Sequence, residues 1–152
     1  MRQILIQVND PASLAARELI ERLDKYLTDL YPAESNHLLT IGELQCPNVT
    51  FLTASVDGEF AGCGAIVNQG GEYAEIKRMF VLPEFRGLKL GRRILEELEN
   101  LARASGLELA RLETGIYQTE ALFLYKNSGY QPRRPFGDYS EDPLSIFMEK
   151  KL

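Results

Sequence analysis

The sequence predicts an α+β fold in which helices cover both faces of one twisted, mostly antiparallel sheet, giving mixed αβα layers. Three stretches typical of strands follow one another at residues 49–56, 60–67 and 73–82, which predicts an antiparallel meander. Asp57-Gly58, between the first two stretches, is a strong hairpin signal. Apolar residues recur at helical spacing before and after the meander. The length of 152 residues suits a single domain spanning residues 1–152.

The elements before the meander are a strand and two helices. Residues 2–8 alternate well enough for a first strand. Asp10 as N-cap, with Pro11 at the first helical position, opens a helix that ends at Tyr31-Pro32. A shorter helix is expected over about 35–44. The first helix has apolar residues three or four positions apart: Ala16, Ile20, Leu23, Leu27 and Leu30.

Helices and strands alternate after the meander. Glycine and proline punctuation sets their ends, because glycine ends helices well and proline cannot continue them. The expected elements are a helix at 92–105 closed by Gly106, a strand at 109–114, a helix at 119–127 stopped by Ser128-Gly129, and strands at 130–133 and 145–149. The predicted order is therefore β-α-α-β-β-β-α-β-α-β-β.

Composition and charge exclude several function classes. The net charge of −5 and the pI near 5.0 argue against nucleic acid as a partner. The apolar runs are far shorter than the roughly 20 residues that cross a bilayer, and the N-terminus has no signal-peptide core. We therefore expect a cytoplasmic protein without a membrane partner. Cys46 and Cys63 show no CxxC spacing and there is no histidine cluster, so no metal site is expected.

The stretch FRGLKLGRRIL at residues 85–95 gathers positive charge where a strand turns into a helix. The first N–H groups of a helix have no partner within it and attract anions. Gly87 and Gly91 let the backbone approach such an anion, and a pyrophosphate fits better than a lone carboxylate. A solvent-exposed basic face is the alternative interpretation. Four cations lie in this stretch: Arg86, Lys89, Arg92 and Arg93.

Two motifs resemble the GNAT superfamily, the acyl-CoA-dependent N-acyltransferases. The loop RGLKLG at 86–91 follows a strand ending Val81-Leu82-Pro83, and is similar to motif A of that family, [QR]-x-x-G-x-[GA]. The segment ALFLYKNSGY at 121–130 resembles the family's A-x-x-L-Y-x-x-x-G-[FY] helix and strand, with Gln118 where asparagine is common. The order of elements matches as well. The segments PAESNHLL, AGCGAI, LETG and FGDYSEDPLSIFMEKKL resemble a bacterial subgroup of small single-domain members.

Lys89 departs from the family pattern, because it stands at the position of the first motif glycine. A residue with a Cβ is costly wherever the backbone needs a positive φ. Either Lys89 keeps ordinary helical dihedrals or the affinity for the cofactor is compromised. We expect the ordinary dihedrals, with Lys89 adding a cation to the site.

The resemblance implies acetyl-CoA as cosubstrate and a sheet splayed between its fourth and fifth strands, at 73–82 and 109–114. Acetyl-CoA would lie in that opening, and an N–H near Met79 or Phe80 would stabilise the thioester oxyanion. The pantetheine would pair with the backbone of the fourth strand and the pyrophosphate would bind the N–H groups of the loop. The implied cofactor-binding residues are Met79, Phe80, Val81, Arg86, Gly87, Leu88, Lys89, Leu90, Gly91, Arg92 and Gln118.

Two catalytic roles follow from the same resemblance. Glu75 lies where several family members have a general base, and an amine that is protonated near pH 7 must lose a proton before it attacks. Its alternative is a surface ion pair with Lys77. Tyr125 lies where the family places the acid that protonates the departing thiolate. Its alternative is simple core packing.

Three further residues are expected near the acceptor. His37 belongs to a segment that forms one wall of the acceptor pocket in the family, although a surface or capping role is an alternative. Arg78 faces away from Glu75 by strict alternation, but a bulge, usual in family members, would re-aim it. Tyr139 lies in the long connection between the last two strands, where a mobile solvated loop is the default.

The predicted function is therefore transfer of the acetyl group of acetyl-CoA to a primary amine of a small molecule, such as an amino acid or related metabolite. Direct attack in a ternary complex is expected. A protein or peptide amine is one alternative acceptor. A non-catalytic acyl-CoA-binding or sensing module is another possibility, although it would have no need of Glu75 and Tyr125. The family also suggests a homodimer.

Overall fold

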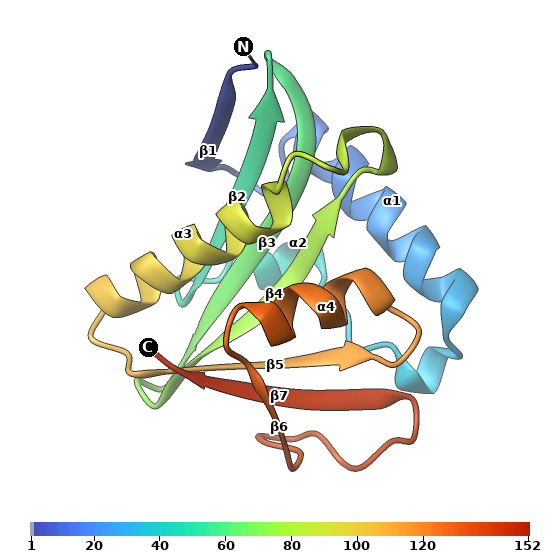
Figure 1. The fold of residues 1–152 in the computed structure, drawn as a ribbon, viewed down its shortest axis with the longest axis vertical. Coiled ribbons are helices and arrows are strands. Elements are labelled where there is room, and N and C mark those ends of the chain that lie inside the picture. The colour runs from blue at the N-terminus through green and yellow to red at the C-terminus, as the bar shows by residue number, and fades with distance from the viewer. Residues whose placement is uncertain (1) are drawn as a thin grey trace.

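The computed structural model describes residues 2–152, which form one seven-stranded sheet of order β1-β2-β3-β4-β5-β7-β6 (Figure 1). All neighbouring strands are antiparallel except β4 and β5. The order of elements along the chain is the predicted one. The strands are β1 (Ile4–Val8), β2 (Val49–Val56), β3 (Glu59–Gln69), β4 (Tyr73–Val81), β5 (Leu109–Gly115), β6 (Gln131–Arg133) and β7 (Ser145–Lys151), and the helices are α1 (Leu14–Leu30), α2 (Ile41–Leu44), α3 (Leu90–Ala104) and α4 (Thr119–Asn127).

Helices cover both faces of the sheet, as Figure 1 shows for α1 on one side and for α3 and α4 on the other. The apolar face of α1 packs on Phe51, Cys63 and Phe80 in one core. The apolar face of α3, with Ile94 and Leu98, packs on the opposite side of the sheet in a second core. Burial of these amphipathic faces is the main force that holds the layers together.

The hairpin between β2 and β3 turns at Asp57-Gly58, as predicted. Both residues have positive φ, at 51° and 85°, and Val56 pairs with Glu59 across the turn. These dihedrals suit the right-handed twist of the two strands. No helix within residues 2–152 has the length and apolar character needed to cross a membrane.

Two N-terminal predictions were wrong. Ser13, not Asp10, caps α1, because its hydroxyl accepts a hydrogen bond from Ala16 N–H at 3.3 Å. Asp10 instead accepts from Ala12 N–H at 2.9 Å in the turn before the helix. The helix expected over 35–44 is a single 3₁₀ turn at Ala33–Ser35 followed by an extended segment and then α2. A capping box between Thr40 and Glu43 starts α2 there.

The parallel strands β4 and β5 pair over three residues and then separate. Ala74, Glu75 and Ile76 face Ala110, Arg111 and Leu112, and no later residues of the two strands pair within the described chain. The edge of β4 from Lys77 onward therefore lies open toward β5. This opening positions the site described below.

A bulge in β4 changes which face its side chains address. Lys77 pairs with Ala65, while Phe80 pairs with Cys63, so β4 has one residue more than β3 across this interval. Arg78 takes a left-handed φ of 57° at the bulge. Residues 75 and 77 lie on the α1 side of the sheet, whereas Met79 and Val81 pack against the core under α3. The predicted bulge is thereby confirmed.

Candidate active site

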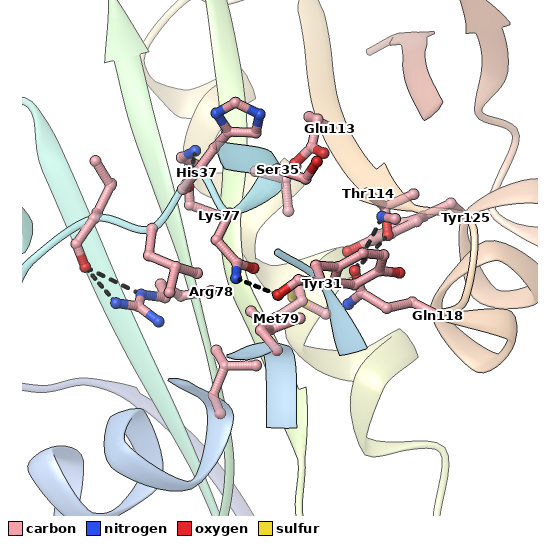
Figure 2. Close-up of a pocket in the computed structure, with 17 residues that line it drawn as sticks. Tyr31, Ser35, His37, Lys77, Arg78, Met79, Glu113, Thr114, Gln118 and Tyr125 are labelled. Atoms are coloured by element: carbon pink, nitrogen blue, oxygen red, sulfur yellow. Dashed lines mark hydrogen bonds between the residues drawn. The ribbon is translucent and has the colours of Figure 1, made fainter. Parts of the chain in front are cut away.

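A small central cavity of about 70 Å³ lies in the opening between β4 and β5. Figure 2 shows His37, Ser35 and Glu113 at one end of it, and Thr114, Gln118 and Tyr125 at another. The cavity is lined from both faces of the sheet, because Glu113 belongs to the face covered by the β6–β7 connection and Tyr125 belongs to α4. The opening thus passes through the sheet.

Two larger cavities meet the central one. The first, of about 860 Å³, lies along α3 and α4 and is called the α3–α4 cavity; it shares Met79, Gln118 and Tyr125 with the central cavity. The second, of about 440 Å³, lies under the β6–β7 connection and is called the loop cavity; it shares His37 and Lys77 with the central cavity. The central cavity therefore lies between the other two and shares lining residues with each of them.

The loop before α3 forms one wall of the α3–α4 cavity and fits a phosphate group. Among residues 2–152, no acceptor pairs with the backbone N–H groups of residues 87–92. These N–H groups lie at the positive end of the dipole of α3. Arg86 and Arg92 border the same cavity and are held by ion pairs with Glu120 and Glu96, at 3.1 and 3.0 Å. The chemistry of this donor set suits the pyrophosphate of a coenzyme.

Lys89 does not keep the helical dihedrals expected of it. Its φ of 59° and ψ of 29° are left-handed, so the chain makes the turn into α3 with the conformation that glycine supplies in the family motif. Gly87 has φ of 90° and turns the chain just before it. A left-handed lysine costs about 1–2 kcal/mol, and the burial of Leu90 and Ile94 in α3 offsets that cost.

Tyr125 joins the central and α3–α4 cavities, as a proton donor to a thiolate would require. Its side chain is buried, and its ring contacts Tyr130 edge-on at 5.8 Å between centroids. Burial raises the pKa of the Tyr125 hydroxyl, and the nearby Glu113 charge raises it further. The hydroxyl therefore keeps its proton at neutral pH.

Glu75 is buried rather than part of a surface ion pair, and it lines the loop cavity. Oε1 accepts from Gln69 Nε2 at 3.0 Å, and Oε2 accepts from Tyr139 Oη at 2.6 Å. Lys77 Nζ lies 3.5 Å from Oε2. Both carboxylate oxygens are therefore already hydrogen-bonded, and Glu75 does not border the central cavity that holds Tyr125.

His37 and Tyr139 meet over the loop cavity. Their rings contact edge-on with centroids 5.0 Å apart, and both residues line that cavity. Lys77 Nζ donates to Tyr139 Oη at 2.7 Å and to the His37 carbonyl at 3.0 Å. The expectation of a solvated loop at Tyr139 was wrong, because these contacts and the packing of its ring on Phe136 and Phe147 anchor it.

Arg78 lines the central cavity and also holds neighbouring elements together. Its guanidinium donates to Asp24 on α1 and to the Leu39 carbonyl, and its side chain is only 4% exposed. The bulge aims it there, since the extra residue puts Arg78 on the α1 side together with Lys77. Arg78 therefore ties β4 to α1 and to the segment before α2 at the edge of the central cavity.

Sequence reasoning missed Glu113 and Tyr31. Glu113 is a half-buried carboxylate at the central cavity, and Ser145 Oγ donates to its Oε2 at 2.7 Å. Tyr31 closes another side of that cavity and accepts a hydrogen bond from Tyr117 N–H at 3.0 Å. The available signal for Glu113 was its place near the end of the strand that splays from β4. Residues 2–152 contain no group of three or more His, Cys, Asp or Glu side chains arranged to hold a metal ion.

Comparisons with known proteins identify close relatives. Residues 16–130 match the model of the Acetyltransferase (GNAT) family. An IAA acetyltransferase of Azospirillum brasilense is 51% identical over 153 residues, covering 100% of each chain. The uncharacterized N-acetyltransferase YsnE of Bacillus subtilis is 34% identical, covering 97% of this chain and 99% of its own.

Solved structures share the fold. A Klebsiella pneumoniae protein described as an acyl-CoA N-acyltransferase superposes with a TM-score of 0.85 and 38% identity, covering 99% of this chain and 98% of that one. PaiA N-acetyltransferase from Thermoplasma acidophilum, solved in complex with coenzyme A, gives a TM-score of 0.78 at 20% identity, covering 99% of each chain, and this likeness concerns the fold alone. The chain belongs to the acetyltransferase (GNAT) family and is an N-acetyltransferase of the GNAT type.

Proposed function

We propose that the protein moves the acetyl group of acetyl-CoA to a primary amine of a small molecule by direct attack, with both substrates bound at once. The observation that carries the proposal is a central cavity, at the opening between β4 and β5, that shares lining residues with two larger cavities. A donor on the α3–α4 side and an acceptor on the loop side would meet at Tyr125 without sharing an entrance.

The α3–α4 cavity suits the acyl donor. Its volume of about 860 Å³ is in the range of cofactor sites, and the unpaired N–H groups of residues 87–92 lie at one end. The open edge of β4 at Met79, Phe80 and Val81 offers backbone groups to the pantetheine amides. Gln118, whose Oε1 accepts from Gly115 N–H at 3.0 Å, fixes the turn between β5 and α4 beside the acetyl end.

The residues of the chain have defined tasks in this reaction. Met79 N–H, at the bulge, would stabilise negative charge on the carbonyl oxygen. Tyr125 would give a proton to the departing sulfur. A carboxylate would take the proton of the acceptor ammonium, and by resemblance that carboxylate is Glu75.

The loop cavity favours a small cationic acceptor over a protein segment. Glu43, Glu75 and Asp138 line it against Lys77 as the positive side chain, so its walls attract an ammonium group. Ser35 Oγ donates to Asp142 at 2.6 Å and joins the two segments that cover the site. A cavity of about 440 Å³ beneath such a cover holds a metabolite rather than an extended chain.

The test combines binding and turnover on the purified protein. Calorimetry with acetyl-CoA should show binding at a single site. Free thiol should then be released from acetyl-CoA only when an acceptor is added from a panel of amino acids, polyamines and IAA, the last because a relative carries that name. Binding without release from any acceptor would favour the sensing module, and an absence of binding would reject the donor site itself.

One variant isolates the donor site. Gly91→Glu should abolish acetyl-CoA binding, because a Cβ there already approaches Leu124 Cδ2 at 3.2 Å and the carboxylate faces the pyrophosphate. Gly42→Glu adds the same group at an open, exposed position on α2 and should bind normally. Normal affinity in Gly91→Glu would reject the assignment of the loop. The proposal includes a cytoplasmic location, as expected from the sequence, and a homodimer, as implied by the family resemblance alone.

A further inference from the structure

Glu113 is the carboxylate that the central cavity contains and that the proposed mechanism leaves unused. It is half-buried near the end of β5, where that strand has separated from β4. Ser145 Oγ donates to Oε2 at 2.7 Å, and no group within residues 2–152 donates a hydrogen bond to Oε1. One oxygen is thereby fixed in place, while the other keeps its capacity to accept a proton.

Glu75 differs from Glu113 in the cavity that it lines and in the hydrogen bonds to its carboxylate oxygens. It lines the loop cavity and not the central one, and hydrogen bonds from Gln69 and Tyr139 occupy its two oxygens. A proton transferred to Glu75 would therefore have to compete with these two hydrogen bonds and with the nearby Lys77 ammonium, at a residue that is 4% exposed. Glu113 lines the same cavity as Tyr125, and so lies on the side of the acceptor from which the amine must reach the thioester.

The surroundings of Glu113 make its carboxylate a better proton acceptor than an exposed glutamate. Burial raises the pKa of the Glu113 carboxyl, against the lowering effects of the Ser145 hydrogen bond and of His37 and Lys77. A base works best when its pKa approaches the working pH. Its charged or titratable neighbours come from several elements around it: Tyr31 from the C-cap of α1, His37 from the segment before α2, Glu75 and Lys77 from β4, Tyr125 from α4, and Tyr139 from the β6–β7 connection.

We propose that Glu113, rather than Glu75, takes the proton of the acceptor ammonium, while Glu75 holds Tyr139 and Lys77 in place around the loop cavity. This inference rests on the proposed function. The geometry behind it is the shared cavity of Glu113 and Tyr125, with one unpaired oxygen on Glu113.

The proposed reaction begins with the acceptor in its ammonium form. Glu113 takes one proton from the ammonium and leaves the nitrogen with a lone pair. That nitrogen forms a bond to the acetyl carbonyl carbon, the bond from this carbon to sulfur breaks, and the electron pair passes to the sulfur. Tyr125 gives the sulfur a proton and regains one, through water, from the nitrogen. Glu113 finally releases its proton to solvent, so ammonium and thioester become amide, thiol and one proton.

The kinetic test compares three glutamine variants with the same acceptor, which is the amine of the panel that the wild type acetylates fastest. Glu113→Gln should lower kcat/KM for the amine by about 100-fold at pH 7, the size expected for loss of a general base, with acetyl-CoA affinity unchanged within about twofold. In Glu113→Gln, the fall of kcat/KM on the acid side of the pH profile should also disappear. Glu75→Gln should mainly raise KM, and Glu149→Gln, on the neighbouring β7, should leave turnover unchanged.

A second acceptor separates catalysis from structure. Hydroxylamine is largely unprotonated at pH 7 and needs no base before it attacks. The Glu113→Gln defect should therefore shrink to less than about tenfold with hydroxylamine, whereas a merely structural defect would persist with every acceptor.

Thermal stability gives a readout that does not depend on turnover. The folded state raises the pKa of Glu113 above its ordinary value of 4.5, so its contribution to stability is present below that value and is lost as the pH rises through the folded-state pKa. Glu113→Gln should therefore melt roughly 2–4 °C higher than the wild type at pH 7, and the gain should disappear near pH 4.

The outcomes are distinguishable. Acceptor-dependent thiol release that persists within threefold in Glu113→Gln but falls about 100-fold in Glu75→Gln would overturn the inference and leave the proposed function standing. No acceptor-dependent release by the wild type would overturn both. Loss of release in Glu113→Gln, with higher thermal stability and a smaller defect with hydroxylamine, would establish Glu113 as the base.

Discussion

The hydroxyl of Tyr31 lies where a Cβ on Gly115 would stand, since a Cβ built on that glycine comes within 1.9 Å of the tyrosine oxygen. The Tyr31 ring also stacks on Tyr117 at 5.6 Å between centroids. This contact joins the end of α1 to the end of β5 across the central cavity. The absence of a side chain at residue 115 thus sets the position of one wall of the site.

Gly115→Ala should displace Tyr31, because neither the hydroxyl nor the ring can keep its place beside the new methyl group. Overpacking of this kind costs about 1–3 kcal/mol of the free energy of unfolding. Turnover should fall as well, since the wall of the central cavity moves. Denaturant unfolding and thiol release measure both effects. Gly42→Ala, at an open helical position, is the matched control and should not destabilise the protein.

Tyr125→Phe should lower kcat by about 100-fold and leave the Kd for acetyl-CoA nearly unchanged, because it removes only the hydroxyl that the proposed mechanism uses as proton donor. Stability should not fall, since the Tyr125 hydroxyl makes no hydrogen bond with other groups among residues 2–152. Tyr117→Phe removes a hydroxyl from a side chain that is 52% exposed and should keep full activity. An unaltered rate in Tyr125→Phe would remove this residue from the mechanism.

Lys89→Gly should stabilise the protein by about 1 kcal/mol, because glycine adopts the left-handed φ of 59° without a Cβ penalty. Lys89→Ala keeps a Cβ in the same conformation and should not stabilise. Both variants lose the cation beside the loop, so both should bind acetyl-CoA a few-fold more weakly. Denaturant unfolding and calorimetry separate the two effects, and equal stability of the two variants would refute the conformational argument.

Glu149→Gln should lower the melting temperature at pH 7. The hydrogen bond from Arg111 Nε at 2.7 Å, joined by one from Arg133, lowers the pKa of the Glu149 carboxyl in the folded state. A depressed pKa stabilises above the ordinary value of 4.5 and loses that effect as the pH falls through the folded-state pKa. The difference from wild type should therefore close in acid. Glu96→Gln, in an exposed pair with Arg92, should change little at any pH.

The sequence predicted the order of all the strands and helices, because punctuation and periodicity are local properties. Its errors lie where short polar residues compete for the same backbone groups. Asp10 and Ser13 both suit an N-cap, and only the packing of α1 on the sheet decides between them. The segment 36–40 reads as helical but is held extended by contacts from Arg78 and Lys77, residues distant in sequence.

The sequence predicted those residues of the candidate site that belong to a motif and missed those that do not. The loop at 86–91 and Tyr125 lie together on the α3–α4 cavity, as the two motifs indicated. Glu113 gave no motif signal, because its importance comes from the separation of β5 from β4 after Ile76, a long-range property of the sheet. The prediction of helical dihedrals for Lys89 failed for another reason. The type of side chain does not determine φ where tertiary packing imposes a left-handed backbone.

The extra residue at Arg78 divides β4 into two parts whose odd-numbered side chains point to opposite faces of the sheet. Before it, Glu75 and Lys77 face the loop cavity; after it, Met79 and Val81 face the α3–α4 cavity. Under the proposed function, substitutions upstream of the bulge should therefore change which amine is selected while the coenzyme contacts remain intact. Deleting a single residue there would exchange the two faces for every position that follows. A family that keeps one donor and varies its acceptors is well served by such a strand.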